Sequence, residues 1–348
     1  MRRMQEDVLA EATRLDQDPA LQARPILSFP QRVRRKLGAA VVDNIFLQSA
    51  RLGRLLPISD PRFHRIDVAC DIPYRDSGSS DHTLDVYRPA GTAGKRPVVL
   101  YIHGGGFRFL SKDTHWLFGL SYARRGYVVF NINYRLAPKH PYPAAISDAC
   151  AAYAWVVKNA ERFGGDLSRL VVAGESAGAN LATGVTLATC YERPEPWARE
   201  VFDTGVTPKV TVPVCGMLQV SDPERLLRRR KLRAIVHDRV AEVTDAYLHG
   251  VKPSCREDLD FADPVCLLER GVKPDRPLPA FFAPCGTRDP LLDDSRRLAT
   301  ALQKLGVTVQ APIFPGELHA FHAMVFRDSA KRCWRELFSF VDGHLHAR

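Results

Sequence analysis

The sequence predicts an α/β protein in which a mainly parallel, eight-stranded sheet is flanked by helices. From about residue 64 onward, strand-like segments alternate with helix-like segments, which is the order that builds parallel sheets. Several strand segments are nearly continuous apolar runs, as expected where helices cover both faces of a sheet. The chain has 348 residues, of which 45% are hydrophobic and 25% charged, so it can form a large core. We therefore expect one main domain with a smaller cap.

Eight strands and four helices account for the alternation. The strands are expected at residues 65–70, 83–87, 98–103, 127–133, 170–174, 209–218, 280–285 and 307–314. The helices are expected at residues 144–163, 177–191, 294–305 and 329–344. Glycines directly after the first and third of these helices are typical helix ends.

Two stretches fall outside the alternation. Residues 1–60 look helical, and residues 222–278 separate two strands by more than a normal crossover. Long insertions of this kind commonly form lids over a site. We therefore divide the chain into an N-terminal cap segment, 1–60, and a main domain, 61–348, in which 222–278 contributes to the cap. The basic, apolar segment 32–56 could lie on a membrane surface, but we expect it to pack on its own protein.

Charge and cysteine content exclude several functions. The formal charge is +10, but the excess is concentrated at 32–36 and 225–233 and no nucleic-acid module accompanies it, so we expect no nucleic-acid partner. Eight cysteines lack a CxxC pair or Cys/His ligand spacing, which argues against a metal site and a disulfide scaffold. Without a secretory signal or an 18-residue apolar run, the expected location is the cytoplasm.

Residues 174–178 read Gly-Glu-Ser-Ala-Gly and stand between an expected strand and an expected helix. This is the G-x-S-x-G nucleophile elbow, in which a sharp turn exposes the serine at the carboxyl end of the sheet. The pentapeptide also occurs by chance on glycine-rich turns, but the flanking strand and helix distinguish the two cases. Gly174 and Gly178 allow the strand and the helix to approach closely. Ser176 is therefore the predicted nucleophile.

The strand expected at 98–103 ends in a run of three glycines. His103 is followed by Gly104, Gly105 and Gly106, the HGGG pattern that supplies part of an oxyanion hole in esterases and lipases. The backbone N–H groups of Gly105, Gly106 and Ala177 are the expected donors to the acyl oxygen. A phosphate-binding loop would need a following Lys-Ser/Thr pair, which is missing. We expect His103 and Gly104 to support this loop rather than to act as base or donor.

The acid and the base must follow the nucleophile in that order, each on a loop after a late strand. Asp289 follows the seventh expected strand and His319 follows the eighth. His319 would accept the serine proton, and Asp289 would fix its tautomer. Asp293 and Asp294 are rivals of Asp289, although they are placed like charges at a helix start. His322 is a weaker rival of His319.

Together these motifs resemble those of the hormone-sensitive-lipase group of α/β hydrolases, which includes bacterial esterases and arylacetamide deacetylases. The resemblance covers roughly residues 80–345. Two positions depart from the group: Glu175 stands where Asp is commoner, and Ala320 where Gly is usual. The matching blocks are HGGGF at 103–107, NYRLAPKHPYPAA at 133–145, GESAG at 174–178, DPLLDD at 289–294 and HAF at 319–321.

The resemblance implies the α/β-hydrolase fold, a cap built partly from the N-terminal helices, and the triad Ser176, Asp289 and His319. It implies an enzyme without metal or cofactor, a carboxylesterase that cleaves small, short-chain acyl esters through an acyl-enzyme. An amide or lactone hydrolase could use the same triad, because fold does not determine substrate. A non-catalytic small-ligand receptor is the alternative from another class. The oligomeric state is left open, a homodimer being one option.

Overall fold

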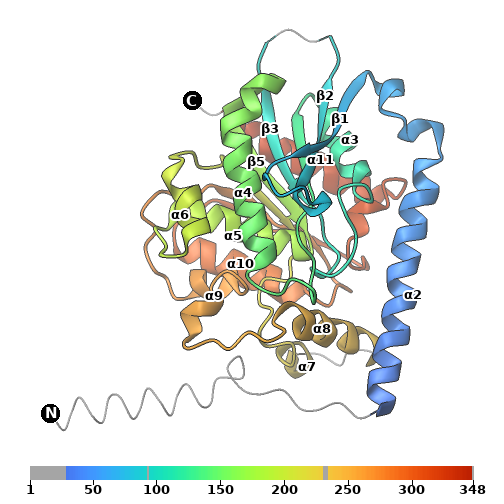
Figure 1. Ribbon diagram of the computed structural model, residues 1–348, viewed down its shortest axis with the longest axis vertical. Helices are drawn as coiled ribbons and strands as arrows, with labels where there is room; N and C mark the ends of the chain where they lie inside the picture. Colours follow the sequence, from blue (N-terminus) through green and yellow to red (C-terminus); the bar gives the residue numbers. More distant parts are fainter. Residues whose placement is uncertain (1–28, 92–93, 230–233, 347–348) are drawn as a thin grey trace, which may run out of the picture.

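The computed structural model describes residues 29–346 except 92–93 and 230–233. At its centre lies an eight-stranded sheet in the order β1-β2-β4-β3-β5-β6-β7-β9 (Figure 1). β2 pairs antiparallel with β1 and β4, and the other pairs are parallel. The predicted α/β class with a mainly parallel eight-stranded sheet is confirmed. The strands are β1 (Ile66–Pro73), β2 (Thr83–Pro89), β3 (Arg96–Ile102), β4 (Val128–Ile132), β5 (Gly165–Glu175), β6 (Val210–Val214), β7 (Ala280–Phe282) and β9 (Val309–Gln310).

Each face of the sheet has its own hydrophobic core. Along β3, Val98 and Leu100 belong to one core and Val99 and Tyr101 to the other, because successive strand side chains point to opposite faces. The first face is covered by α4 (Ala144–Asn159), α5 (Ala177–Cys190) and α10 (Leu292–Lys304). The second face is covered by α3 (Trp116–Ala123) and α11 (Asp328–Leu345). Burial on both faces explains why the central strands are continuous apolar runs.

The last two expected strands are each interrupted. Residues 280–285 divide into β7 and β8 (Cys285–Gly286), and residues 307–314 divide into β9 and β10 (Ile313–Phe314). Pro284 and Pro312 stand at the two breaks, and a proline has no N–H to donate to a strand ladder. β8 and β10 instead pair with each other in a separate small sheet. This small sheet carries the loops of Asp289 and His319.

The four expected helices are present with small shifts at their ends. The helix expected at 144–163 is α4 followed by a 3₁₀ turn, Ala160–Phe163, which ends at Gly164 in a left-handed conformation. Several further helices were not placed individually by the sequence, although three of them lie in the 222–278 segment that was expected to contribute to a helical cap. They are α3, α6 (Pro196–Asp203), α7 (Arg225–Arg229), α8 (Ala234–Tyr247) and α9 (Pro264–Glu269), with 3₁₀ turns at Pro57–Ser59, Pro61–His64, Ser80–His82, Arg256–Leu259 and Phe321–Ala323.

The N-terminal segment forms one long helix, α2 (Phe29–Arg54), beside α8 (Figure 1). Arg34 pairs with Asp238 of α8 at 2.5 Å, and Arg35 pairs with Asp245 at 2.8 Å. The part of the expected cap before residue 29 lies outside the described residues. No helix in the described ranges is long and apolar enough to cross a membrane.

The packing expected for residues 32–56 holds for only one face of α2. On another face of the helix, Val41, Ile45 and Leu52 are 57%, 60% and 64% exposed. The expectation that the apolar residues of this segment pack on the protein is therefore wrong for these three side chains. Arg34 and Arg35 reach α8 through ion pairs, and the three exposed residues lie outside that contact, so their side chains stay in solvent.

Candidate active site

Ser176 lies at a sharp turn between β5 and α5. Its backbone has φ 56° and ψ −116°, an uncommon conformation for a residue other than glycine. Its N–H donates to the carbonyl of Val214 at 3.0 Å, and its carbonyl accepts from the N–H of Met217 at 3.2 Å. These bonds to the last residue of β6 and to the loop that follows it hold the turn in its strained shape. The strand, turn and helix expected around the serine are all present.

The glycines of the elbow are required by close contact. A Cβ on Gly178 would lie 2.0 Å from the carbonyl oxygen of Ile102, and one on Gly174 would lie 2.5 Å from the carbonyl oxygen of Gly178. Real Cβ atoms do not approach oxygen so closely. The start of α5 is thus pressed against the end of β3, directly before the glycine run.

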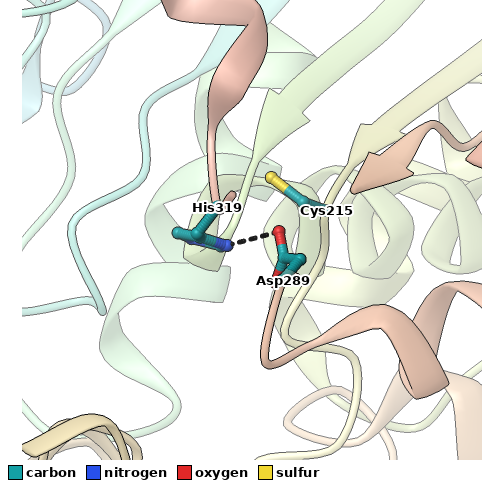
Figure 2. A group of neighbouring side chains, drawn as sticks. All are labelled: Cys215, Asp289 and His319. Carbon is teal, nitrogen blue, oxygen red and sulfur yellow. Dashed lines mark hydrogen bonds and ion pairs between the residues drawn. The ribbon is translucent and has the colours of Figure 1, made fainter. Parts of the chain in front are cut away.

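Asp289 and His319 lie together, as Figure 2 shows. Asp289 Oδ2 is 2.9 Å from His319 Nδ1, and Asp289 Oδ1 accepts the N–H of Leu291 at 2.8 Å. Burial lowers the pKa of His319, but the charge of Asp289 and its hydrogen bond outweigh that effect, so the pKa is raised. The side chain of His319 keeps 30% of its surface exposed, whereas Asp289 is fully buried. Part of the His319 side chain is therefore accessible to solvent.

The rival residues have other contacts. Asp294 is buried beneath Arg225, and its Oδ2 lies 2.6 Å from Arg225 Nη2. The same oxygen accepts hydrogen bonds from the backbone N–H groups of Leu218 and Gln219. Asp293 faces Arg296 at 3.8 Å in the first turn of α10. Burial lowers the pKa of His322 to about 4, so it is neutral, and it packs among aromatic rings. Asp289 is the carboxylate that lies within hydrogen-bonding distance of His319 Nδ1.

The glycine run forms a tight loop beside the elbow. Gly105 and Gly106 have φ values of 104° and 58°, which favour glycine. A Cβ on Gly106 would lie 2.6 Å from the side chain of Val243 on α8. His103 stacks on Tyr134 with ring centroids 4.2 Å apart, and burial lowers the pKa of His103 to about 3. A neutral, stacked histidine agrees with the supporting role expected for it.

A buried carboxylate joins this loop to the elbow, and sequence reasoning missed its partners. Glu175 Oε1 accepts the N–H of Gly104 at 2.6 Å and lies 2.6 Å from His115 Nε2. Tyr101 donates its hydroxyl proton to Glu175 Oε2. Burial raises the pKa of Glu175, but these neighbours lower it to about 2, so the side chain is ionised. The available signal was the carboxylate itself, because a charged side chain that is buried needs a partner.

Comparison with known proteins places the chain in a family. The family model described as the alpha/beta hydrolase fold matches residues 99–323.

The chain belongs to the α/β-hydrolase family. Its motif blocks place it in the hormone-sensitive-lipase group of that family, as the sequence indicated. Its relatives are carboxylesterases and esterases, and the enzyme class of this chain is carboxylic ester hydrolase.

Several relatives of this hydrolase have assigned activities. It is 34% identical to the carboxylesterase NlhH of Mycobacterium tuberculosis over 276 residues, which cover 78% of this chain and 81% of NlhH. It is 31% identical to an ethyl acetate hydrolase of Pseudomonas putida over 253 residues, which cover 70% and 73% of the two chains. Among solved structures, the esterase LipW of Mycobacterium marinum is similar, with a TM-score of 0.70, 26% identity, and 89% and 90% coverage.

Proposed function

We propose that this hydrolase is a serine carboxylesterase in which Ser176 is the nucleophile, His319 the base and Asp289 its orienting acid. The hydrogen bond between Asp289 and His319 is the observation that carries this assignment. Because Asp289 accepts the Nδ1 proton, the lone pair of His319 lies on Nε2, the nitrogen suited to accept the serine proton. The strained elbow that exposes Ser176 supports the same assignment.

The reaction follows from these roles. As Ser176 Oγ attacks the acyl carbon, its proton passes to His319 Nε2 and negative charge develops on the acyl oxygen. The N–H groups of Gly105, Gly106 and Ala177 would stabilise that oxyanion. The proton then passes to the departing alcohol, leaving an acyl group on Ser176. A water molecule activated by His319 releases the acid and restores the serine.

Small, short-chain esters are the proposed substrates. The ethyl acetate hydrolase of P. putida bears the name of such an ester and shares 31% of its aligned residues with this chain. We propose that residues 1–60 and 222–278 form a cap over the acyl site. The contact of Val243 on α8 with Gly106 supports this, because it brings the 222–278 segment onto the expected oxyanion loop. A cytoplasmic location also remains a proposal.

Hydrolysis of a series of p-nitrophenyl esters, from acetate to palmitate, tests the function and the chain-length preference together. We expect the highest kcat/KM for the short esters and near-complete loss of activity in Ser176→Ala. Full activity of Ser176→Ala on the butyrate ester would refute the nucleophile. A matched anilide cleaved faster than its ester would favour amide hydrolysis, and failure of a fluorophosphonate to label Ser176 would favour a receptor.

A further inference from the structure

A cysteine lies next to the proposed base and acid, and the proposed reaction does not use it. Cys215 follows the last residue of β6, is fully buried and has a positive φ of 40°. Its N–H donates to the carbonyl of Pro284 at 3.0 Å. Figure 2 shows its sulfur directed toward the space between Asp289 and His319.

The three side chains offer a compact set of ligand atoms. The sulfur of Cys215, a carboxylate oxygen of Asp289 and a ring nitrogen of His319 all lie within 4.8 Å of one another. Thiolate, imidazole and carboxylate are the ligands that Zn²⁺ accepts, at about 2.0–2.3 Å each. At such bond lengths, ligand atoms around one ion lie about 3–4 Å apart. Shifts of about 1 Å would therefore bring all three onto one ion.

Burial and the charge of Asp289 raise the pKa of the Cys215 thiol, and the backbone N–H of Ala320, the residue after His319, only partly opposes them. The thiol is therefore protonated before a cation binds. A metal ion that coordinates a cysteine displaces this proton, because the charge of the ion stabilises the thiolate. A thiolate and the Asp289 carboxylate together would carry the two negative charges that balance a divalent cation. Three protein ligands would leave the fourth position to water.

We propose that Cys215, Asp289 and His319 form an inhibitory site for a thiophilic divalent cation, Zn²⁺ or its analogue Cd²⁺. The proposal rests on the proposed function, because inhibition requires His319 to be the base. On binding, the cation displaces the thiol proton of Cys215, which leaves to solvent. The neutral imidazole of His319 binds through Nδ1 after its single proton has moved from Nδ1 to Nε2, and no oxidation state changes. The hydrogen bond between Asp289 and His319 is then lost. An imidazole bound to the cation cannot hold the orientation and basicity that the reaction needs.

The test compares inhibition in three proteins: wild type, Cys215→Ala and Cys190→Ser. Cys190 is a matched control, because it is also buried but lies at the far end of α5, where its thiol donates to the carbonyl of Pro277. In a non-chelating buffer, Zn²⁺ should inhibit ester hydrolysis by wild type and Cys190→Ser, and EDTA should restore activity. Without metal, Cys215→Ala should hydrolyse ester about as fast as wild type. Its half-inhibitory Zn²⁺ concentration should be about tenfold higher or more. Equal inhibition of Cys215→Ala and wild type would overturn the proposal.

A spectroscopic measurement separates this site from the catalytic assignment. Cd²⁺ should produce thiolate-to-metal absorbance in the near ultraviolet, and the part that depends on Cys215 should be missing from Cys215→Ala. That signal without esterase activity in any variant would support the cation site and refute the proposed function. Equal Cd²⁺ absorbance in both proteins would refute the site. If Cys215→Ala does not fold, Cys215→Ser provides the same comparison with a side chain closer in size.

Discussion

Replacing Glu175 by alanine tests whether the buried carboxylate next to Ser176 holds the oxyanion loop in place. Glu175 Oε1 accepts the N–H of Gly104, which directly precedes the two expected oxyanion donors. The alanine variant removes this acceptor and leaves the N–H of Gly104 and the side chain of His115 without it in a buried space. The loop is then free to move away from the acyl oxygen.

The expected size of the effect follows from that one hydrogen bond. A hydrogen bond to a charged group contributes about 1.5–3 kcal/mol. If this energy is lost from the transition state, kcat falls by about tenfold to about 100-fold, because about 1.4 kcal/mol corresponds to a factor of ten. Removal of a complete oxyanion donor costs about 100-fold to about 1,000-fold, which is an upper bound. The KM should change little, because the donors act mainly on the charged transition state.

Steady-state hydrolysis of p-nitrophenyl butyrate provides kcat and KM separately for each variant. Glu175→Asp should recover part of the lost kcat, since a carboxylate remains near Gly104. Glu161→Ala is a matched control, because Glu161 is exposed and pairs with Lys95 at the surface. A folded Glu175→Ala protein with the kcat of wild type would refute the positioning role, as would an equal loss of kcat in Glu161→Ala.

Three further changes test other parts of the structure. Gly178→Ala should give insoluble or strongly destabilised protein, because its Cβ would lie 2.0 Å from a main-chain carbonyl oxygen of β3; a thermal midpoint equal to wild type would contradict this. The raised pKa of His319 places the acid limb of the kcat/KM profile above pH 6.5, since only the neutral imidazole accepts a proton. In Asp289→Asn this limb should move to lower pH and kcat should fall about 10,000-fold; an unchanged limb would refute the pairing. Lys112→Met should lower the free energy of unfolding by about 3–5 kcal/mol in urea, because it leaves the buried Asp85 carboxylate without the ammonium 2.8 Å away; a loss under about 1 kcal/mol would refute that role.

The order of strands, helices and motifs was predictable from local sequence. Apolar runs such as that of β3 identify strands buried on both faces, and a glycine on each side of Ser176 identifies a turn that admits no larger residue. The pairing of Asp289 with His319 followed from their order along the chain, and the structure brings the two together at 2.9 Å. The catalytic roles of these residues stay predictions until the variants are measured.

Short elements were harder to predict for physical reasons. Helix α3 is almost wholly apolar and only eight residues long, so it has no polar face to reveal its period. The breaks at Pro284 and Pro312 were marked in the sequence, but that β8 and β10 pair with each other depends on how the two loops meet. The exposed stripe on α2 was missed because amphipathic pattern alone does not say which face finds a partner.

The sequence by itself determined the fold class, the elbow and the order of the candidate triad, because each depends on residues close together in the chain or on their succession. Only the tertiary structure decided which distant side chains share a buried space. It placed His115 against Glu175, 60 residues further along the chain. It also placed Cys215 against Asp289 and His319, although no ligand spacing links the three in sequence. Such contacts arise where the carboxyl ends of neighbouring parallel strands lie side by side. Residues that follow different strands come together there, whatever their separation along the chain.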